Sequence, residues 1–429
     1  MATEVIKMGM LGLGTVGGGV ASIILNHGAT LQERTGMEIQ LKRVLVRDVN
    51  RRRTVDLPRE IYTTAAEDIL GDPSINLVLE LMGGIEPARS YIATALERGK
   101  YVVTANKDLM ALHGQELLEL ARRHNRNIFY EASVGGGIPL IRPLKQSLLA
   151  NHICRIAGII NGTTNYILTR MDQDHMTLDE ALARARALGF AEADPSSDLE
   201  GRDAAYKLAI LASLAFHRRI SLPQIHVEGI GSVTREDIRY ARELGYTIKL
   251  LAVGEQLPEG LCLRVHPALV PLEHPLASVM NEFNAVFIEG DAVGEVMFYG
   301  RGAGSLPTAS SVLADVLEAG RCLRCQVDNG VLENNYREAT VLPMDALVSS
   351  FYLRLQVQDR PGVFAALANA FGDEQVSLGL IIQKRSENGI AEIVLVTHDV
   401  VEERFRKALQ RIMEHPAVQP GHSVFRVLG

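Results

Sequence analysis

Val5-Ile-Lys-Met-Gly-Met-Leu-Gly-Leu-Gly-Thr-Val-Gly17 begins the regular structure of this chain, and the residues up to about 150 repeat its pattern. The apolar run before Gly12 predicts a short strand, and a helix is expected over residues 16–25. Between them, Gly12 permits a tight turn, Gly14 lets a backbone approach a pyrophosphate, and Gly17 allows close packing of helix on strand. Because the amides of a helix N-terminus attract phosphates, this turn predicts a dinucleotide site.

Strands and helices alternate through residues 1–150, which predicts an open parallel sheet of the Rossmann type within an α/β protein. Later strands are expected at residues 39–46, 77–82, 101–104 and 127–130, and helices at residues 88–98 and 108–124. Ligands bind such sheets at the carboxyl ends of the strands, where Gly83, Thr104, Lys107 and the loop 131–139 fall. Lys107 fits either a contact with the bound molecules or an ordinary solvated lysine that opens a helix.

Arginines crowd the end of the second predicted strand. Arg47 follows that strand directly, and the run 51–53 is all arginine. Arginine at this place accommodates a 2′-phosphate, whereas an acid there binds the ribose hydroxyls. The pattern favours NADP(H), and Asp48 leaves NAD(H) possible.

Residues 8–32 contain no Asp, Glu, Lys or Arg, which resembles a signal peptide or a membrane span. Five glycines between Gly12 and Gly19 would break a spanning helix, so no membrane segment is expected. The net charge of −7, with no basic stripe, argues against nucleic acid as a partner. Four cysteines in 429 residues predict a reducing, cytoplasmic location, and Cys322-Leu-Arg-Cys325 is read as two ordinary thiols.

The sequence pattern of residues 151–304 differs from that of residues 1–150, and it predicts an α+β domain for substrate binding and dimerisation. Its expected strands are residues 154–160, 248–253, 261–265, 286–289 and 295–299. Asn161-Gly-Thr-Thr-Asn165, before a helix expected over residues 166–171, offers a polar wall to a small ligand. A helix over residues 309–319 follows a glycine-rich turn at 300–304, and residues 305–340 are expected to pack back on the first domain over the cofactor.

The stretch from Ala187 to Lys207 gathers acids around a helix start. Glu192 and Asp198 lie in an acidic loop, and Asp198 is expected to be the N-cap of the helix that follows. Lys207 is the single charge between residues 204 and 216, and Asp203 precedes it by four residues, on the same helix face. The group fits either a structural ion pair or a reactive site.

The last eighty residues or so predict a separate module in the order βαββαβ, the ferredoxin-like arrangement. Its elements are expected at residues 353–357, 363–371, 378–384, 391–396, 401–413 and 423–427. Residues 342–350 are interpreted as the linker, and the module is assigned to residues 350–429. Removal of the module is expected to leave a folded, active remainder.

With these pieces in place, the chain resembles the monofunctional bacterial homoserine dehydrogenases over essentially its whole length. The motifs that carry the resemblance are Gly12-Leu-Gly-Thr-Val-Gly17, Thr104-Ala-Asn-Lys107, Glu131-Ala-Ser-Val-Gly135, Asn161-Gly-Thr-Thr-Asn-Tyr-Ile167 and Asp198-Leu-Glu-Gly-Arg-Asp-Ala-Ala-Tyr-Lys207. The C-terminal Asp359-Arg-Pro-Gly362 resembles an ACT domain. Because no amino-acid kinase domain precedes the motifs, the bifunctional form with aspartate kinase is not expected.

The resemblance implies reversible hydride transfer between a nicotinamide and C4 of homoserine, which in biosynthesis reduces aspartate 4-semialdehyde. Lys207 matches the proton donor and acceptor on the C4 oxygen, and Lys107 matches a second catalytic lysine. Glu192 and Asp203 match ligands for the amino end of the substrate, with Asp203 also in the catalytic group. Asp198 matches a further acid of that site.

The resemblance also implies bound groups and partners. The coenzyme contacts are assigned to Gly12, Gly14, Thr15, Val16, Gly17, Arg47, Gly83, Thr104, Lys107, Gly189, Gly302 and Gly304. A monovalent cation, usually Na⁺, is expected on the backbone carbonyls of Glu131, Val134, Gly136 and Ile138. The ACT module implies a homodimer or homotetramer and an amino-acid effector at Asp359 and Gly362. Threonine is the candidate effector, and a module that only dimerises is the alternative.

Two other classes of protein compete with this interpretation. An acylating aldehyde dehydrogenase needs a nucleophilic cysteine, and Cys154 falls inside a predicted strand instead of a strand-to-helix turn. A non-catalytic sensor would bind metabolites through the first and last domains alone. The set Lys107, Glu192, Asp203 and Lys207 would have no use in such a sensor.

Overall fold

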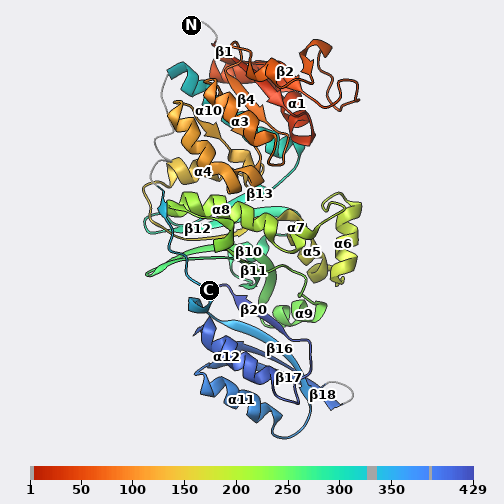
Figure 1. Ribbon diagram of the computed structural model, residues 1–429. Coiled ribbons are helices and arrows are strands. Elements are labelled where there is room, and N and C mark those ends of the chain that lie inside the picture. Colours follow the sequence, from red (N-terminus) through yellow and green to blue (C-terminus); the bar gives the residue numbers. More distant parts are fainter. Residues whose placement is uncertain (1–3, 326–335, 386–388) are drawn as a thin grey trace. The chain divides into compact units, whose positions relative to one another are not determined.

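The structure is a computed structural model that describes residues 4–325, 336–385 and 389–429 (Figure 1). The chain divides into two compact units, each made of three segments. The first contains residues 1–153, 206–222 and 284–338, and the second contains residues 154–205, 223–283 and 339–429. Within the described ranges, no helix combines the length and the apolar character that crossing a membrane requires.

A six-stranded parallel sheet forms the centre of the first unit, in the order β3-β2-β1-β4-β5-β6. This order confirms the predicted Rossmann-type fold. The strands are β1 (Glu4–Leu11), β2 (Met37–Leu45), β3 (Tyr62–Thr63), β4 (Leu77–Glu80), β5 (Tyr101–Thr104) and β6 (Ile128–Phe129). Their central positions are buried and apolar, as expected of strands covered on both faces.

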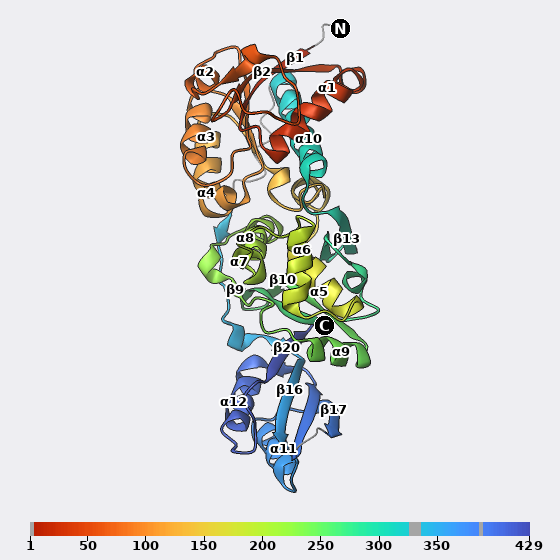
Figure 2. The same ribbon diagram turned by 90° about the vertical axis from the view of Figure 1, so that its right-hand side faces the viewer.

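Helices cover both faces of this sheet (Figure 2). They are α1 (Thr15–Thr35), α2 (Glu67–Leu70), α3 (Ala88–Glu97), α4 (Lys107–Arg123) and α10 (Ser305–Cys325). The unit also contains the pair β12 (Phe283–Gly290) and β13 (Gly294–Arg301), and the short pair β8 (Arg218–Arg219) and β14 (Arg337–Glu338).

Helix α1 runs ten residues beyond the predicted end at Leu25, continues through Gly28 and stops only at Gly36. Gly36 adopts a left-handed φ of 71° and its amide caps the carbonyl of Gln32. Helix α10 is also longer than predicted and packs beside α1, as Figures 1 and 2 both show. The approach is close enough that a Cβ on Gly19 would lie 2.5 Å from the Ser305 carbonyl oxygen. Cys322 is buried in the core below these helices, and the side chain of Cys325 lies outside the described part.

The second unit is built on a mixed sheet in the order β7-β10-β11-β20-β16-β18-β17, with β9 beside β11. Its strands are β7 (Ile153–Ile159), β9 (His226–Val227), β10 (Tyr246–Leu257), β11 (Gly260–Pro271), β16 (Phe351–Gln358), β17 (Leu378–Arg385), β18 (Ile390–Thr397) and β20 (Ser423–Val427). Strands β10 and β11 form a long hairpin, longer at both ends than the two predicted strands. Helices α5 (Gly162–Gln173), α6 (Leu178–Ala187) and α9 (Arg235–Glu243) belong to the same unit.

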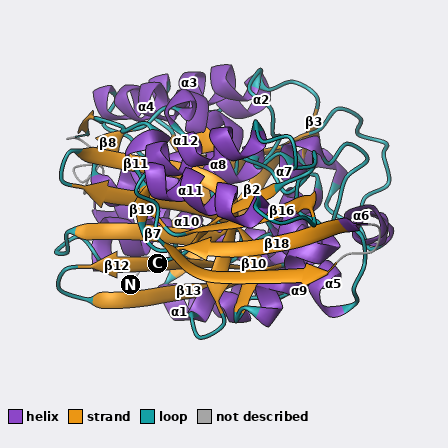
Figure 3. Cartoon of the chain, turned by 90° about the horizontal axis from the view of Figure 1, so that it is seen from below, coloured by secondary structure: helices purple, strands orange, loops and turns teal. Residues whose placement is uncertain are grey.

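Four of these strands form the predicted ferredoxin-like module. The order β20-β16-β18-β17 places the fourth, first, third and second strands of the module side by side. Helices α11 (Val363–Asp373) and α12 (Glu402–Met413) pack on one face of these strands (Figure 3). Phe351 and Phe405 stack in the core that they share. The short strands β15 (Val348–Ser349) and β19 (Val400–Val401) pair beside it.

Two local predictions are wrong. Asp198 is not the N-cap of the long helix, because it lies inside the short helix α7 (Ser196–Leu199). The long helix α8 (Arg202–Phe216) starts only after Gly201, whose left-handed φ of 80° separates the two helices. In addition, the predicted turn at residues 161–165 is mostly helical, since α5 already begins at Gly162. Gly162 to Asn165 therefore form its first turn.

The C-terminal module is bonded to the rest of the second unit through buried charges. Arg354 on β16 binds Asp237 on α9 at 2.7 Å, and the Asp237 side chain is fully buried. Arg426 on β20 binds Glu228 at 3.0 Å as well as Glu402 at 2.6 Å. Removal of residues 350–429 would also remove Arg354 and Arg426 and leave Asp237 and Glu228 without these partners. That the remainder folds alone stays a prediction.

Candidate functional site

The glycine-rich turn after β1 has the geometry of a pyrophosphate cradle. Gly12 adopts a φ of 98°, and its amide donates to the Leu45 carbonyl at 3.1 Å. A Cβ on Gly17 would lie 2.5 Å from the Gly12 oxygen, so only glycine fits there. Gly14, the N-cap of α1, has no described atom within 4 Å of such a Cβ and receives no side-chain cap. The first amides of α1 therefore face open space that suits a phosphate.

A second glycine-bearing loop lies beside this turn. Gly304 has a φ of 124°, and the hydroxyl of the next residue, Ser305, donates to the Thr15 carbonyl at 2.8 Å. Gly302 packs so closely on the side chain of Asn284 that any Cβ would overlap it. The structure thus brings the predicted contacts Gly302 and Gly304 to the same end of the sheet as Gly12 and Gly17.

A buried carboxylate ties together the ends of β4 and β5. Glu80 is completely buried and accepts hydrogen bonds from the Gly83 amide at 3.2 Å and the Thr104 hydroxyl at 2.7 Å. The same hydroxyl accepts from the Asn106 amide, and the Asn106 side chain donates to the Gly84 carbonyl at 2.7 Å. Sequence reasoning missed Glu80, although a lone acid in an apolar strand was a readable signal.

Lys107 stands at the point where this network meets α4. Asn106 caps the helix by accepting from the Leu109 amide at 3.1 Å, which makes Lys107 the first helical residue. The half-exposed ammonium lies 3.7 Å from the Asp108 carboxylate. The structure therefore places Lys107 at the carboxyl end of β5, the end of the sheet where the sequence predicted a ligand.

The arginines that follow β2 differ in what they contact. Arg53 donates to the carbonyl of Arg51 at 2.8 Å and lies over the Tyr62 ring at 5.0 Å. The Asp48 carboxylate accepts from the Asn50 amide at 2.8 Å, which closes a local turn. Arg47 has an exposed side chain immediately beyond β2. Arg53 thus holds the loop, whereas the side chain of Arg47 is exposed.

In the second unit, one amide group holds two acids together. The Nδ2 of Asn161 donates to Asp198 at 2.7 Å and to Asp203 at 2.8 Å. Its oxygen accepts from the Thr164 amide at 2.8 Å, which fixes the side chain as the N-cap of α5. Asn161 and Asp203 are both buried. Two carboxylates on one nitrogen concentrate negative charge, which favours a bound cationic group.

The other residues of the acidic stretch precede or follow this pair in the chain. Lys207 is half-buried on α8, one turn beyond Asp203. Glu192 is exposed in the loop that precedes α7, and Gly189 ends α6 with a φ of 76°. The structure thus joins Asp198 and Asp203 through Asn161, a residue that the sequence had singled out only as part of a polar wall.

The loop from Glu131 to Ile138 offers main-chain oxygens. The Glu131 carboxylate accepts from the amides of Leu140, Ile141 and Arg142 at 2.6–2.8 Å, so it caps the turn that follows. Gly136, with a φ of 52°, presents a carbonyl that accepts from the Ser311 hydroxyl at 2.7 Å. The carboxylate of Glu131 is therefore occupied by amides, and a cation at this loop would meet carbonyl oxygens.

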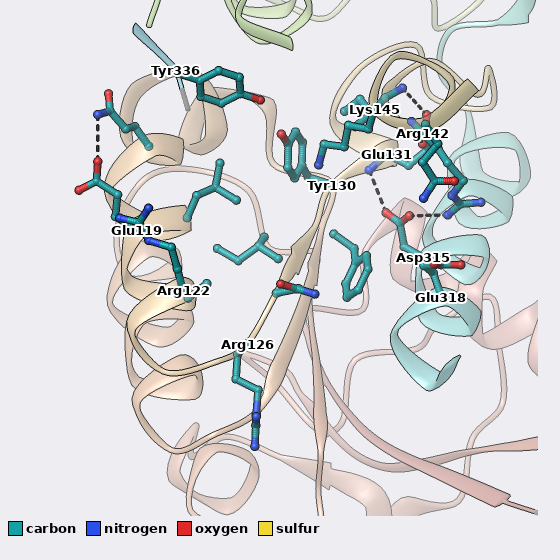
Figure 4. A pocket seen from close by; sticks show the side chains of 18 of the residues that line it. Glu119, Arg122, Arg126, Tyr130, Glu131, Arg142, Lys145, Asp315, Glu318 and Tyr336 are labelled. Carbon is teal, nitrogen blue, oxygen red and sulfur yellow. Dashed lines mark hydrogen bonds and ion pairs between the residues drawn. The ribbon is translucent and has the colours of Figure 1, made fainter. Parts of the chain in front are cut away.

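Behind this loop lies a cavity of about 130 Å³ in which buried charges are grouped (Figure 4). Asp315 accepts from the Glu131 amide at 2.8 Å and from Arg142 at 3.0 Å. Burial raises the pKa of Asp315 to about 7 and lowers that of Lys145, which lies over the Tyr130 ring at 4.2 Å, to about 8. Arg122, near the C-terminal end of α4, also lines the cavity. None of Gly12, Gly14 and Gly17 lines it, so this cavity is not the glycine cradle.

The parallel sheet in its 3-2-1-4-5-6 order, the glycine cradle and the half-buried lysine one turn beyond Asp203 on α8 define a nicotinamide-dinucleotide-dependent oxidoreductase. Family models match in three consecutive parts. The homoserine dehydrogenase NAD-binding domain covers residues 12–131, the homoserine dehydrogenase domain residues 139–317, and the ACT domain residues 351–417.

Whole-length relatives agree with these matches. The chain is 44% identical to homoserine dehydrogenase of Bacillus subtilis and 47% identical to that of Synechocystis, each over 99% of both chains. A crystal structure of a homoserine dehydrogenase from Thiobacillus denitrificans superposes with a TM-score of 0.92 at 38% identity, covering 99% of this chain and 98% of the other. The chain belongs to the homoserine dehydrogenase family, and it is an NAD(P)-dependent oxidoreductase.

Proposed function

We propose that the chain reduces L-aspartate 4-semialdehyde to L-homoserine with NADPH, through a site made of Asn161, Asp198, Asp203 and Lys207. The observation that carries the proposal is the pair of carboxylates held by one amide, one helical turn before a lysine on an otherwise apolar helix. The test follows NADPH absorbance with homoserine and NADP⁺, and in reverse with the semialdehyde. Absence of turnover in both directions would refute it.

The coenzyme, when bound, supplies a hydride to the C4 carbonyl carbon, and the carbonyl oxygen then needs a proton. Lys207 donates that proton from its ammonium and recovers it from the hydroxyl in the reverse direction. Lysine suits this exchange because burial lowers its pKa readily, whereas arginine stays protonated. Lys107 is the second catalytic lysine in this proposal.

The acids bind the amino end of the substrate. Asp198 and Asp203 are fixed by Asn161, and their charge complements the substrate ammonium. Glu192, exposed in the loop before α7, adds a further carboxylate. Substrate binding through these groups would orient C4 relative to the proton donor, which is worth more than the charge attraction alone.

We further propose that NADP(H) is preferred over NAD(H). The Asp48 carboxylate is occupied by the Asn50 amide, and Arg47 is exposed at the place where a 2′-phosphate would lie. A hyperthermophilic archaeal homoserine dehydrogenase, 28% identical with a TM-score of 0.62, has been solved in complex with NADPH. The complex of that relative with NADPH supports NADP(H) as the preferred coenzyme of this chain.

Arg47→Ala is expected to raise the KM for NADPH about tenfold and to leave that for NADH within about twofold, because a charged hydrogen bond to phosphate is worth about 1.5–3 kcal/mol. Initial rates with each coenzyme measure the effect. Arg34→Ala, in the last turn of α1, serves as the matched control. Equal weakening of both coenzymes would show that Arg47 does not contact the phosphate.

We propose a monovalent cation, Na⁺, at the carbonyls of Glu131, Val134, Gly136 and Ile138. Hard cations take oxygen ligands, and the engaged Glu131 carboxylate leaves main-chain oxygens as the donors. Activity is expected to fall several-fold when tetramethylammonium replaces Na⁺ at constant ionic strength, and to return when Na⁺ is added back. Rates that do not depend on the cation would contradict this site.

The ACT module is proposed to bind threonine at Asp359 and Gly362 and to pair with a second copy. Both residues are exposed, and Gly362 caps α11 with a φ of 90°. Strand β17 lies at the edge of the sheet and exposes Leu380 and Ile381, which favours pairing between copies. A cytoplasmic location is also proposed, since a chain of 429 residues with four cysteines is typical of a reducing compartment.

If threonine inhibits the enzyme through this loop, Asp359→Asn should weaken the inhibition by about 5-fold to 150-fold, the range of a typical allosteric coupling. Rates at rising threonine concentration measure the shift, with the uninhibited rate unchanged. Asp373→Asn, at the exposed end of α11, is the matched control. An unaltered threonine response would leave the module as a dimerisation device.

The competing acylating reaction is disfavoured by the position of Cys154. This exposed thiol lies near the start of β7 and not at a strand-to-helix turn. Insensitivity of the turnover to thiol alkylation would dismiss that alternative. The sensor alternative fails if either direction of the assay shows turnover.

A further inference from the structure

A second polar cavity lies in the second unit, where the central hairpin meets the C-terminal module. Its volume is about 150 Å³, ample for a molecule of several non-hydrogen atoms. Strands β10 and β11 form one wall, and residues 348–350 with the end of β20 form the other. Neither Asp359 nor Gly362 lines it, nor does any residue of the proposed catalytic site.

Two side chains of β11 carry polar atoms that the rest of the described chain does not satisfy. Arg264 and His266 are two positions apart and therefore share one face of the strand. Arg264 is 7% exposed and His266 is 3% exposed. The Nε and Nη1 groups of Arg264 and the Nε2 of His266 are buried and have no hydrogen-bond partner among the described residues. Such orphaned groups cost free energy unless something binds them.

The hydrogen-bonding roles of these groups follow from their neighbours. Arg264 uses Nη2 to bind Glu255 at 3.1 Å, which leaves the two other groups as donors. The Nδ1 of His266 lies 2.9 Å from the Pro267 carbonyl, an atom that can only accept, so Nδ1 carries the proton. Burial and the nearby Arg426 and Arg264 hold the pKa of His266 well below its usual value, so the ring is neutral. Its Nε2 is therefore an acceptor.

The surrounding charges are of both signs. Arg155 lies opposite Glu255 in the pairing of β7 with β10, and it also donates to the Gly429 carbonyl. Arg426, which binds Glu228 and Glu402, lies beside Ala268 in the pairing of β11 with β20. The exposed Asp399 binds the Ser350 hydroxyl at 2.7 Å at the rim of the cavity. The cavity thus offers donors for an anion, an acceptor for an N–H or O–H group, and acids for an ammonium.

We propose that this cavity binds a free amino acid, with its carboxylate on Arg264 and a donor group on His266. A simple anion would satisfy the guanidinium but not the imidazole acceptor, and Glu255 and Asp399 would repel it. A zwitterion of amino-acid size meets all three requirements. This site is separate from the loop at Asp359 and Gly362, and it does not depend on the reaction that the enzyme catalyses.

Isothermal titration of the full-length chain tests the proposal, with L-threonine, propionate and inorganic phosphate as the three probes. L-threonine is expected to bind more tightly than propionate, which lacks a donor for His266, and more tightly than phosphate. Arg264→Gln, which keeps a hydrogen bond to Glu255, should weaken L-threonine at least about tenfold. Asp359→Asn should leave this binding event unchanged, which separates it from the proposed effector loop.

A second cavity variant keeps the test decisive if Arg264→Gln does not fold. Ala268→Leu fills the cavity from the same face of β11 without touching the Arg264–Glu255 pair, and it should weaken L-threonine at least as much. Arg404→Gln, on the exposed side of α12, is the matched control. With the effector loop disabled by Asp359→Asn, L-threonine binding that survives both cavity variants, absence of binding by any probe, or a preference for phosphate would each overturn the proposal.

Discussion

Replacement of Lys207 by alanine is expected to lower kcat at least about 100-fold in both directions, while the Kd for NADPH stays within about twofold. The reason lies in the position of this residue. Lys207 is the single charged side chain of α8 beyond Asp203, and it lies half-buried one turn away from that acid. Its loss removes the proton donor to the C4 oxygen but none of the groups around the glycine cradle.

Two further variants make the Lys207 result specific. Lys207→Arg keeps the positive charge but cannot release a proton near neutral pH, so its kcat should remain low. Lys407→Ala, which removes an exposed ion pair on α12, should retain full activity. Coenzyme binding is measured by fluorescence titration of NADPH. A Lys207→Arg enzyme with normal kcat would mean that the lysine provides charge and not a proton.

The fold was largely predictable because apolar periodicity and glycine placement dominate it. The turn from Gly12 to Gly17 fixes the first strand and helix, and the order of the strands follows from chain alternation. The ends of the elements were less predictable. Helix α1 continues past Leu25 and through Gly28 to its cap at Gly36, and nothing in the local sequence separates a helix that ends at Leu25 from one that continues.

The candidate site was predictable in its residue types but not in its connections. Asp198 was expected to cap α8, yet the left-handed turn at Gly201 moves it into α7 and onto Asn161. That contact joins residues 37 positions apart. Glu80 was missed for a similar reason, since its partner Thr104 lies on the neighbouring strand. Local patterns cannot show which distant side chain will satisfy a buried polar group.

The same long-range bonding changes the interpretation of the C-terminal module. Its sequence predicts a self-contained βαββαβ fold, and its strand order confirms that fold. Arg354 and Arg426 nevertheless reach out of the module to Asp237 and Glu228. Arginine in a strand gives no sign of its partner when the partner lies more than a hundred residues away. Point variants in the full-length chain are therefore the sound way to test regulation.

Asp203→Asn is expected to lower kcat/KM for homoserine roughly 30-fold to 1,000-fold, the equivalent of about 2–4 kcal/mol for one partner of a desolvated charge pair. The asparagine oxygen can still accept from Asn161, which now binds Asp203 at 2.8 Å. The new amide nitrogen, however, would turn a donor toward the substrate ammonium. The KM should therefore rise, and the Kd for NADPH should not.

Thermal stability distinguishes a role of Asp203 in substrate binding from a role in a structural ion pair. Because the amide keeps the hydrogen bond from Asn161, the Tm of Asp203→Asn should change by less than about 4 °C. Asp179→Asn, exposed in the first turn of α6, is the control and should alter neither the Tm nor the KM for homoserine. A large fall in Tm with an unchanged KM would show that Asp203 serves the fold alone. A raised KM in a stable protein would place the ammonium of the substrate on the carboxylates that Asn161 joins.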